Sequence, residues 1–149
     1  MNYFAFGSNL DLKQMARRCP GAAVGAYATL QDHQLLFRGP SQRRKAGVAT
    51  VDPSPGHHVP GLLFRVGDDC LAVLDRLEGH PHWYVRHVVT VFTEGGEEEE
   101  ALLYRLPDDV DKMPPTDAYV GQIRRAYGHH GPAHGFHETL LEEAERRGR

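Results

Sequence analysis

The chain opens with a short apolar strand that runs directly into a helix, and this junction constrains the fold most. Tyr3–Phe6 is apolar and rich in aromatic residues, which is typical of a short buried strand. Gly7–Asn9 then interrupts the strand with residues that tolerate unusual backbone angles. A helical pattern follows over 10–18, with Asn9 or Asp11 placed to cap it. Such a junction presents unpaired backbone N–H groups that can bind a carboxylate, a phosphate or an oxyanion, although an ordinary tight turn is the alternative.

The rest of the chain consists of short strand-like segments, with one helix in the middle and two at the end. We expect strands at Val24–Leu30, Gln34–Phe37, Ala46–Val51, Val59–Val66, Trp83–Thr93 and Ala101–Leu106. The third and fourth of these segments predict a hairpin with a longer loop. Helical spacing predicts helices over 71–77, capped by Asp68 or Asp69, and over 117–127 and 135–147. We therefore expect one α+β domain over residues 1–149, centred on a curled, mostly antiparallel sheet.

Composition excludes several classes of protein. The chain has 149 residues, the size of one domain, and a formal net charge of -3 with no long basic block, so we expect no nucleic-acid partner. No segment approaches the length of a signal peptide or a membrane span. Cys19 and Cys70 lie far apart and form no CxxC pair, which favours a reducing cytoplasm and two packed thiols over a disulfide. Arg43, Arg44 and Lys45 are expected to form a solvated face.

Glu78 is the candidate catalytic residue. It occupies the last turn of the predicted middle helix, directly before Gly79, where a carboxylate lies against the negative end of the helix dipole. A residue that is locally unfavourable at the end of an element indicates a functional position. The dipole and partial burial would raise the pKa of Glu78, which suits a group that accepts and returns a proton near neutral pH. An exposed terminal glutamate is the alternative.

Other side chains have weaker signals. Tyr84 opens the longest predicted strand, and Arg86 follows on the same face, so either could orient Glu78 or bind a substrate carboxylate. Tyr119 begins a helix, where packing is the simplest role. The ten histidines include i,i+3 and i,i+4 pairs at 130–137, but no Asp or Cys completes a metal-binding set, so we expect no metal site and exposed histidines. Cys70 lacks a neighbouring base and is not expected to be a nucleophile.

Two motifs together resemble the gamma-glutamylcyclotransferase (AIG2-like) family. The first is Tyr3–Leu10, and the second is Leu74-Asp75-x-x-Glu78-Gly79, followed by Tyr84. Weaker matches are Val59–Phe64 and Pro114-Pro115-x-x-x-Tyr119, so the resemblance covers roughly residues 1 to 127.

The resemblance implies a small mixed, mostly antiparallel β-barrel with flanking helices. It implies cyclisation of a small-molecule γ-glutamyl amino acid, peptide or amine to 5-oxoproline, with Glu78 as general acid/base and no metal or other cofactor. The substrate-binding residues that it implies are Tyr3, Phe4, Ala5, Phe6, Gly7, Ser8, Asn9, Tyr84 and Tyr119. The family usually has a tyrosine before Gly-Ser-Asn, where this chain has Phe6, and we expect the missing hydroxyl to affect substrate preference more than the chemistry.

We expect a cytoplasmic protein, as the cysteine usage favours, with no membrane partner, and by analogy alone a homodimer is possible. Two other classes of function stay open at this point. One is a non-catalytic small-molecule-binding or regulatory module of the same fold, although such a module would have little use for Glu78. The other is a hydrolase that uses the histidines.

Overall fold

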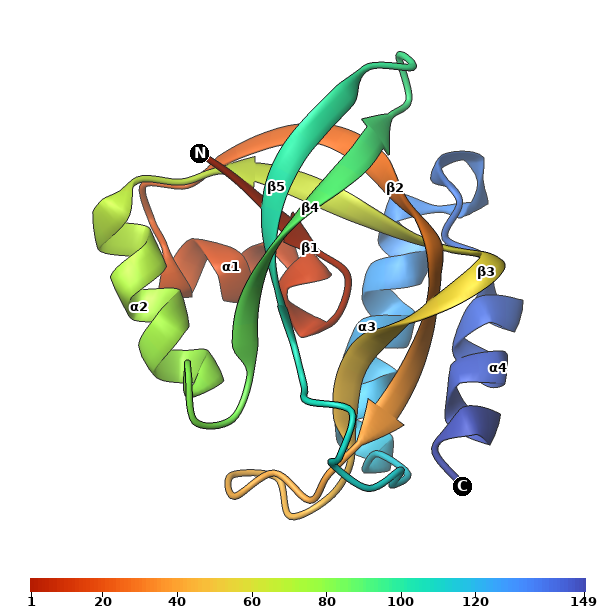
Figure 1. Cartoon of the computed structure of the whole chain (residues 1–149). Coiled ribbons are helices and arrows are strands. Elements are labelled where there is room, and N and C mark those ends of the chain that lie inside the picture. The colour runs from red at the N-terminus through yellow and green to blue at the C-terminus, as the bar shows by residue number, and fades with distance from the viewer.

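The computed structural model describes all residues, 1–149, as a closed five-stranded barrel with four α-helices around it (Figure 1). The strands are β1 (Asn2–Ala5), β2 (Ala23–Arg38), β3 (Val48–Arg65), β4 (Val85–Thr93) and β5 (Glu98–Arg105). They follow the order β1-β3-β2-β4-β5 around the barrel. Neighbouring strands are antiparallel except β1 and β5, which pair in parallel at Tyr3 and Leu102 and close the barrel. The expected mixed, mostly antiparallel barrel is therefore confirmed.

Two long, curved strands replace four of the short strands expected from the sequence. Segments 24–30 and 34–37 belong to one strand, β2. The pairing of β2 with β3 shifts register between Gln31 and His33, but it continues on both sides of Asp32. Asp32 has a positive φ of 57°, and its carboxylate accepts a hydrogen bond from the Gly56 N–H group. The predicted hairpin between 46–51 and 59–66 is wrong, since both segments lie in β3, and β3 pairs with β2 instead.

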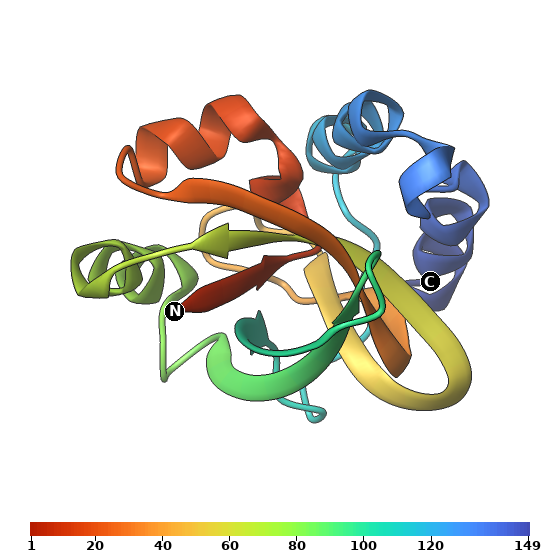
Figure 2. The same ribbon diagram turned by 90° about the horizontal axis from the view of Figure 1, so that it is seen from above.

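The helices lie in two pairs on opposite sides of the barrel (Figures 1 and 2). One pair is α1 (Leu12–Arg18) and α2 (Asp68–Glu78), and the other is α3 (Asp117–His130) and α4 (Glu138–Arg147). Single 3₁₀ turns, η1 (Ser8–Leu10) and η2 (Pro132–His134), precede α1 and α4. Asp11 caps α1 by accepting from two backbone N–H groups, whereas Gly67 precedes α2 and no side chain caps it. The predicted cap at Asp68 or Asp69 is therefore wrong, and both residues lie in the first turn of the helix.

The barrel interior is filled by aromatic and branched side chains, and one glycine allows β1 and β3 to approach closely. Phe4 and Ala5 of β1 form an almost fully buried pair that lies opposite Leu63 and Leu62 of β3 in the ladder. Gly61 lies against this pair, because a Cβ atom there would be 2.6 Å from the Ala5 carbonyl oxygen and would collide with the Phe4 ring. The close β1–β3 contact fixes where the chain leaves β1, and therefore where the turn after Phe6 begins.

A disulfide joins Cys19 and Cys70, contrary to the expectation of two packed thiols. Cys19 directly follows α1, and Cys70 lies in the first turn of α2, with 5.3 Å between their Cα atoms. The two residues are 51 positions apart, and the barrel strands between them bring the two helices side by side. The spacing of the two cysteines in the sequence does not predict that they lie close together. No helix is both long and apolar enough to cross a membrane.

Candidate active site

Glu78 is the last residue of α2, as the sequence predicts, and its side chain turns toward the barrel. Gly79 ends the helix in the left-handed conformation, with φ of 71°, and its N–H group bonds to carbonyls of the last turn. Only 17% of the Glu78 side chain is exposed. Burial raises the pKa of Glu78 to about 6, against the opposing effect of the Arg18, Arg43 and Arg44 guanidinium groups. Glu78 is therefore mostly a carboxylate at neutral pH that can still take up a proton.

A buried polar network holds the turn after β1 next to Glu78. Asn9 is 3% exposed, and its amide nitrogen donates to the Tyr3 hydroxyl at 2.9 Å. The Asn9 amide oxygen accepts from both Gln14 and Arg18 at 2.9 Å. The Arg18 guanidinium also lies 3.8 Å from the Glu78 carboxylate. Asn9 thus connects the N-terminal turn to the cation that faces Glu78.

Two tyrosines from distant parts of the chain bind the same backbone unit of β3. The Tyr119 hydroxyl accepts from the Ala49 N–H group at 3.0 Å, and the Tyr84 hydroxyl donates to the Ala49 carbonyl at 2.6 Å. Tyr119 comes from α3 and Tyr84 from the residue before β4. Burial raises the pKa of Tyr119 to about 12 and raises the pKa of Tyr84 as well, so both phenols stay protonated.

Several hydrogen-bond donors in this region have no partner within the protein. The Tyr3 and Tyr119 hydroxyls each accept a hydrogen bond but donate none. The N–H groups of Gly7, Ser8 and Asn9 also make no hydrogen bond, whereas Gln14 holds the Ser8 hydroxyl at 2.9 Å. Gly7 approaches β3 closely, because a Cβ atom there would lie 3.3 Å from the Ala49 Cβ atom. The predicted cluster of free amides at the strand–helix junction is therefore present.

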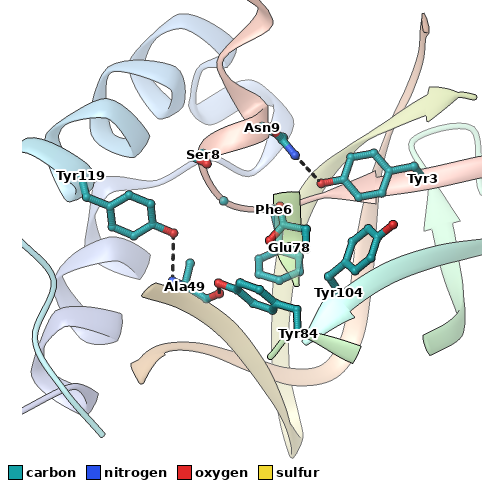
Figure 3. A pocket seen from close by; sticks show the side chains of 10 residues that line it. Tyr3, Phe6, Ser8, Asn9, Ala49, Glu78, Tyr84, Tyr104 and Tyr119 are labelled. Carbon is teal, nitrogen blue, oxygen red and sulfur yellow. Dashed lines mark hydrogen bonds between the residues drawn. The ribbon is translucent and has the colours of Figure 1, made fainter. Parts of the chain in front are cut away.

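These groups line a small inner cavity that adjoins a larger outer one. The inner cavity has a volume of about 40 Å³ and is lined by Tyr3, Phe6, Gly7, Ser8, Asn9, Ala49, Glu78, Tyr84, Tyr104 and Tyr119. Figure 3 shows the four tyrosines around Glu78. The outer cavity has a volume of about 650 Å³, and four residues line both cavities: Ser8, Glu78, Tyr84 and Tyr119. Glu78 therefore lies where the two cavities meet.

Most residues that the sequence assigns to the site line this inner cavity, but two do not. Phe4 and Ala5 are buried to within 1% and are absent from its wall. Phe4 lies on the opposite face of β1 from Tyr3 and packs beside Gly61, so its side chain does not reach this cavity. Tyr104 also lines the inner cavity, although no sequence pattern indicates it. It lies in β5, and its hydroxyl donates to the Asp75 carboxylate at 2.6 Å.

Arg86 and the histidines have other partners. Arg86 lies 3.4 Å from Asp75 rather than against Glu78, so it does not orient the candidate base. His130 is buried, not exposed as expected, and hydrogen-bonds the Tyr27 hydroxyl and the Leu10 carbonyl. His134 pairs with Glu94 at 2.8 Å. No group of three or more His, Cys, Asp or Glu side chains is arranged to hold a metal ion.

The chain belongs to the family described as gamma-glutamyl cyclotransferase, AIG2-like, whose model matches residues 3–121. The gamma-glutamylcyclotransferase of Bos taurus is 35% identical over 122 residues, which cover 78% of this chain and 64% of the bovine protein. The match thus spans just under two thirds of that relative's length. The gamma-glutamylcyclotransferase of Mus musculus is 32% identical over 154 aligned positions, which cover 99% of this chain and 81% of the mouse protein.

A solved structure of a protein described as gamma-glutamyl cyclotransferase has the same architecture. It superimposes with a TM-score of 0.86 at 32% identity, over 94% of this chain and 85% of that protein. The sequence-based assignment to the family is therefore confirmed, and so is the fold that the resemblance implies.

Proposed function

We propose that this protein is a gamma-glutamylcyclotransferase that converts a γ-glutamyl compound to 5-oxoproline and a free amine. The observation that carries the proposal is the position of Glu78, a buried carboxylate at the junction of two cavities and beside unpaired donors. Relatives that are named gamma-glutamylcyclotransferase support the same activity.

The inner cavity suits one end of such a substrate. Its volume of about 40 Å³ is enough for a group of about three heavy atoms, given that one water needs about 10–15 Å³. The unpaired groups here are all hydrogen-bond donors: the Tyr3 and Tyr119 hydroxyls and the amides of the turn at 7–9. A carboxylate accepts hydrogen bonds from such groups, whereas an ammonium is itself only a donor. We place the substrate α-carboxylate here, so that the α-amine and the γ-carbonyl lie near Glu78.

Glu78 then serves as base and as acid within one reaction. Free in solution the α-amine is mostly an ammonium, which cannot attack, and the Glu78 carboxylate accepts its proton. The amine nitrogen forms a bond to the γ-carbon, and the γ-carbonyl oxygen becomes an oxyanion that the turn amides stabilise, each such donor being worth about 3 kcal/mol. As the oxyanion re-forms the carbonyl and the bond from the γ-carbon to the leaving nitrogen breaks, Glu78 gives its proton to that nitrogen. The carboxylate then accepts the second proton of the former α-amine from the ring nitrogen and passes it to the released amine, which leaves as an ammonium. The nucleophile is part of the substrate, so the protein has only to fold it into attacking geometry.

The direct test is formation of 5-oxoproline from a panel of γ-glutamyl dipeptides and γ-glutamyl amines. We expect Glu78→Gln to fold and bind substrate but to lose about 10²–10⁴-fold in kcat. The double variant His134→Ala/His137→Ala is the control and should keep the wild-type rate. Full activity of Glu78→Gln would remove this residue from the mechanism, and a large loss in the histidine variant would favour the hydrolase alternative.

The cytoplasmic location and the homodimer remain predictions. The Cys19–Cys70 disulfide bears on the first of them, because such bonds are rare in a reducing compartment unless they are transient. Thiol titration of the protein isolated without reductant would show whether the bond is present, and size-exclusion chromatography with light scattering would give the oligomeric state.

A further inference from the structure

The outer cavity has a wall of positive charge. Arg18, Arg43, Arg44 and Arg76 line it, together with His80 and His82. The only carboxylates on the same wall are Asp75 and Glu78. Arginine is well suited to binding carboxylates, because its guanidinium group donates two parallel hydrogen bonds.

Both carboxylates of this wall already have a basic side chain within ion-pair distance, whereas three of its four arginines form no ion pair. Asp75 accepts from the Tyr104 hydroxyl and lies 3.4 Å from Arg86, which is outside the cavity wall. Glu78 lies 3.8 Å from Arg18. Arg43, Arg44 and Arg76 form no ion pair with any carboxylate of the protein. The cavity therefore holds excess positive charge.

Arg43 and Arg44 belong to the loop between β2 and β3, which forms one side of the outer cavity. Arg44 is held there by two contacts. Its guanidinium group lies 4.2 Å from the centre of the Tyr119 ring, and its backbone N–H group donates to the Ser41 hydroxyl. The Arg43 side chain is exposed on the same loop. The expectation that this cluster is only a solvated face is therefore incomplete, since two of its three members line the cavity and Lys45 does not.

The leaving portion of a γ-glutamyl substrate has to lie in this outer cavity. With the α-carboxylate in the inner cavity and the scissile bond at Glu78, the released amine extends away from the barrel. The outer cavity, at about 650 Å³, is within the range of about 300–1,000 Å³ for small-molecule sites, so it can hold a leaving portion of one or more residues.

We infer that the outer cavity is an anion-binding subsite, formed chiefly by Arg43 and Arg44, that selects γ-glutamyl peptides whose leaving portion carries two or more carboxylates. This inference rests on the proposed cyclotransferase function. A γ-glutamyl-glutamate, or a short chain of γ-linked glutamates, has the charge and length that this wall complements. A γ-glutamyl derivative of a polyamine or of the lysine side chain places an ammonium against the same arginines, and is a poor substrate for that reason.

The test uses two dipeptides of nearly equal shape that differ by one charge, γ-glutamyl-glutamate and γ-glutamyl-glutamine. We expect the wild-type protein to favour the first by about tenfold in kcat/KM, because two partly exposed arginines each add a modest ion-pair contribution. Arg43→Gln should reduce this ratio about threefold, and Arg43→Gln/Arg44→Gln should bring it close to one. Lys45→Gln removes the same charge from the same loop and should leave both the ratio and the rates unchanged.

The ratio of the two substrates is the informative quantity, because a change in the pKa of Glu78 affects both dipeptides equally. A wild-type ratio of one or less would overturn the inference while leaving the cyclotransferase function intact, and so would an unchanged ratio in the double arginine variant. Titration calorimetry with the Glu78→Gln variant provides a readout that needs no turnover. We expect about tenfold tighter binding of γ-glutamyl-glutamate, lost when Arg43 and Arg44 are also replaced, and equal binding of the two dipeptides would refute the subsite even if no 5-oxoproline were ever formed.

Discussion

Replacing Glu78 with Gln should make the protein more stable above pH 6, while removing its activity. Burial raises the Glu78 pKa from 4.5 to about 6, so the folded protein binds this proton more tightly than the unfolded chain. The stability contributed by the protonated group is fully present below pH 4.5 and is lost as the pH rises through 6. A shift of this size corresponds to about 2 kcal/mol of unfolding free energy at pH 7.5, and Gln does not incur this loss because it does not ionise.

The assay is urea unfolding of the wild-type and variant proteins at several values between pH 4.5 and 8. We expect the two free energies of unfolding to agree within a few tenths of a kcal/mol at pH 4.5, where both side chains are neutral. The advantage of the variant should grow to about 2 kcal/mol at pH 7.5. All other titrating groups are common to both proteins, so their effects cancel in the difference.

Glu142→Gln is the matched control, because Glu142 is an exposed carboxylate on α4. Its free energy of unfolding should stay within about 0.5 kcal/mol of the wild-type value, because surface substitutions have small effects. A Glu78→Gln variant that is less stable than the wild-type protein at pH 7.5, or a difference that does not change with pH, would refute the view that burial dominates the environment of Glu78.

Three further substitutions test other parts of the site and the fold. Arg18→Gln removes a charge 3.8 Å from the Glu78 carboxylate, a contact worth about 1 to 4 kcal/mol depending on the local dielectric. If Glu78 is the base, the acidic limb of the pH–rate profile should move up by about one pH unit, and Arg17→Gln on the same helix should not move it. Tyr119→Phe leaves the Ala49 N–H group unpaired, so thermal melting should show a loss of about 1–3 kcal/mol of unfolding free energy. It also removes a hydroxyl that we propose donates to the substrate, so kcat/KM should fall at least about tenfold, and wild-type kinetics would exclude Tyr119 from binding. Gly61→Ala should cost about 2–3 kcal/mol in chemical unfolding, because its Cβ atom collides with β1, and a neutral effect would mean that the strands separate easily.

The catalytic candidate could be predicted from the sequence because its signal is local. A glutamate directly before a helix-ending glycine breaks a rule of helix electrostatics, and that rule needs no knowledge of the fold. The free amides after β1 could be predicted in the same way, since strand, small residues and helix follow one another in the sequence. Strand alternation also predicts that the side chains of Tyr3 and Phe4 face opposite sides of β1, so that only one of the two lines the cavity.

The rest of the site is formed by segments that are distant in the sequence, and no local sequence pattern predicts that they lie close together. Tyr104 lies in β5 and Arg18 at the end of α1, and each reaches the site only because the barrel closes. The Cys19–Cys70 bond has the same origin. The two long strands are hard to predict for another reason. Asp32 and the prolines inside β3 have the composition of turns, although the β2–β3 ladder continues past them.

The position of Glu78 between the inner cavity and the wider outer cavity has a consequence for the order in which the products of the proposed reaction dissociate. In the proposed reaction, the carboxylate of the lactam stays in the inner cavity once the ring has closed, and the released amine lies in the outer cavity, between the lactam and solvent. The amine must therefore dissociate first and the lactam second. Steady-state kinetics should accordingly show competitive inhibition by 5-oxoproline, which is released last, and noncompetitive inhibition by the amine, which is released first.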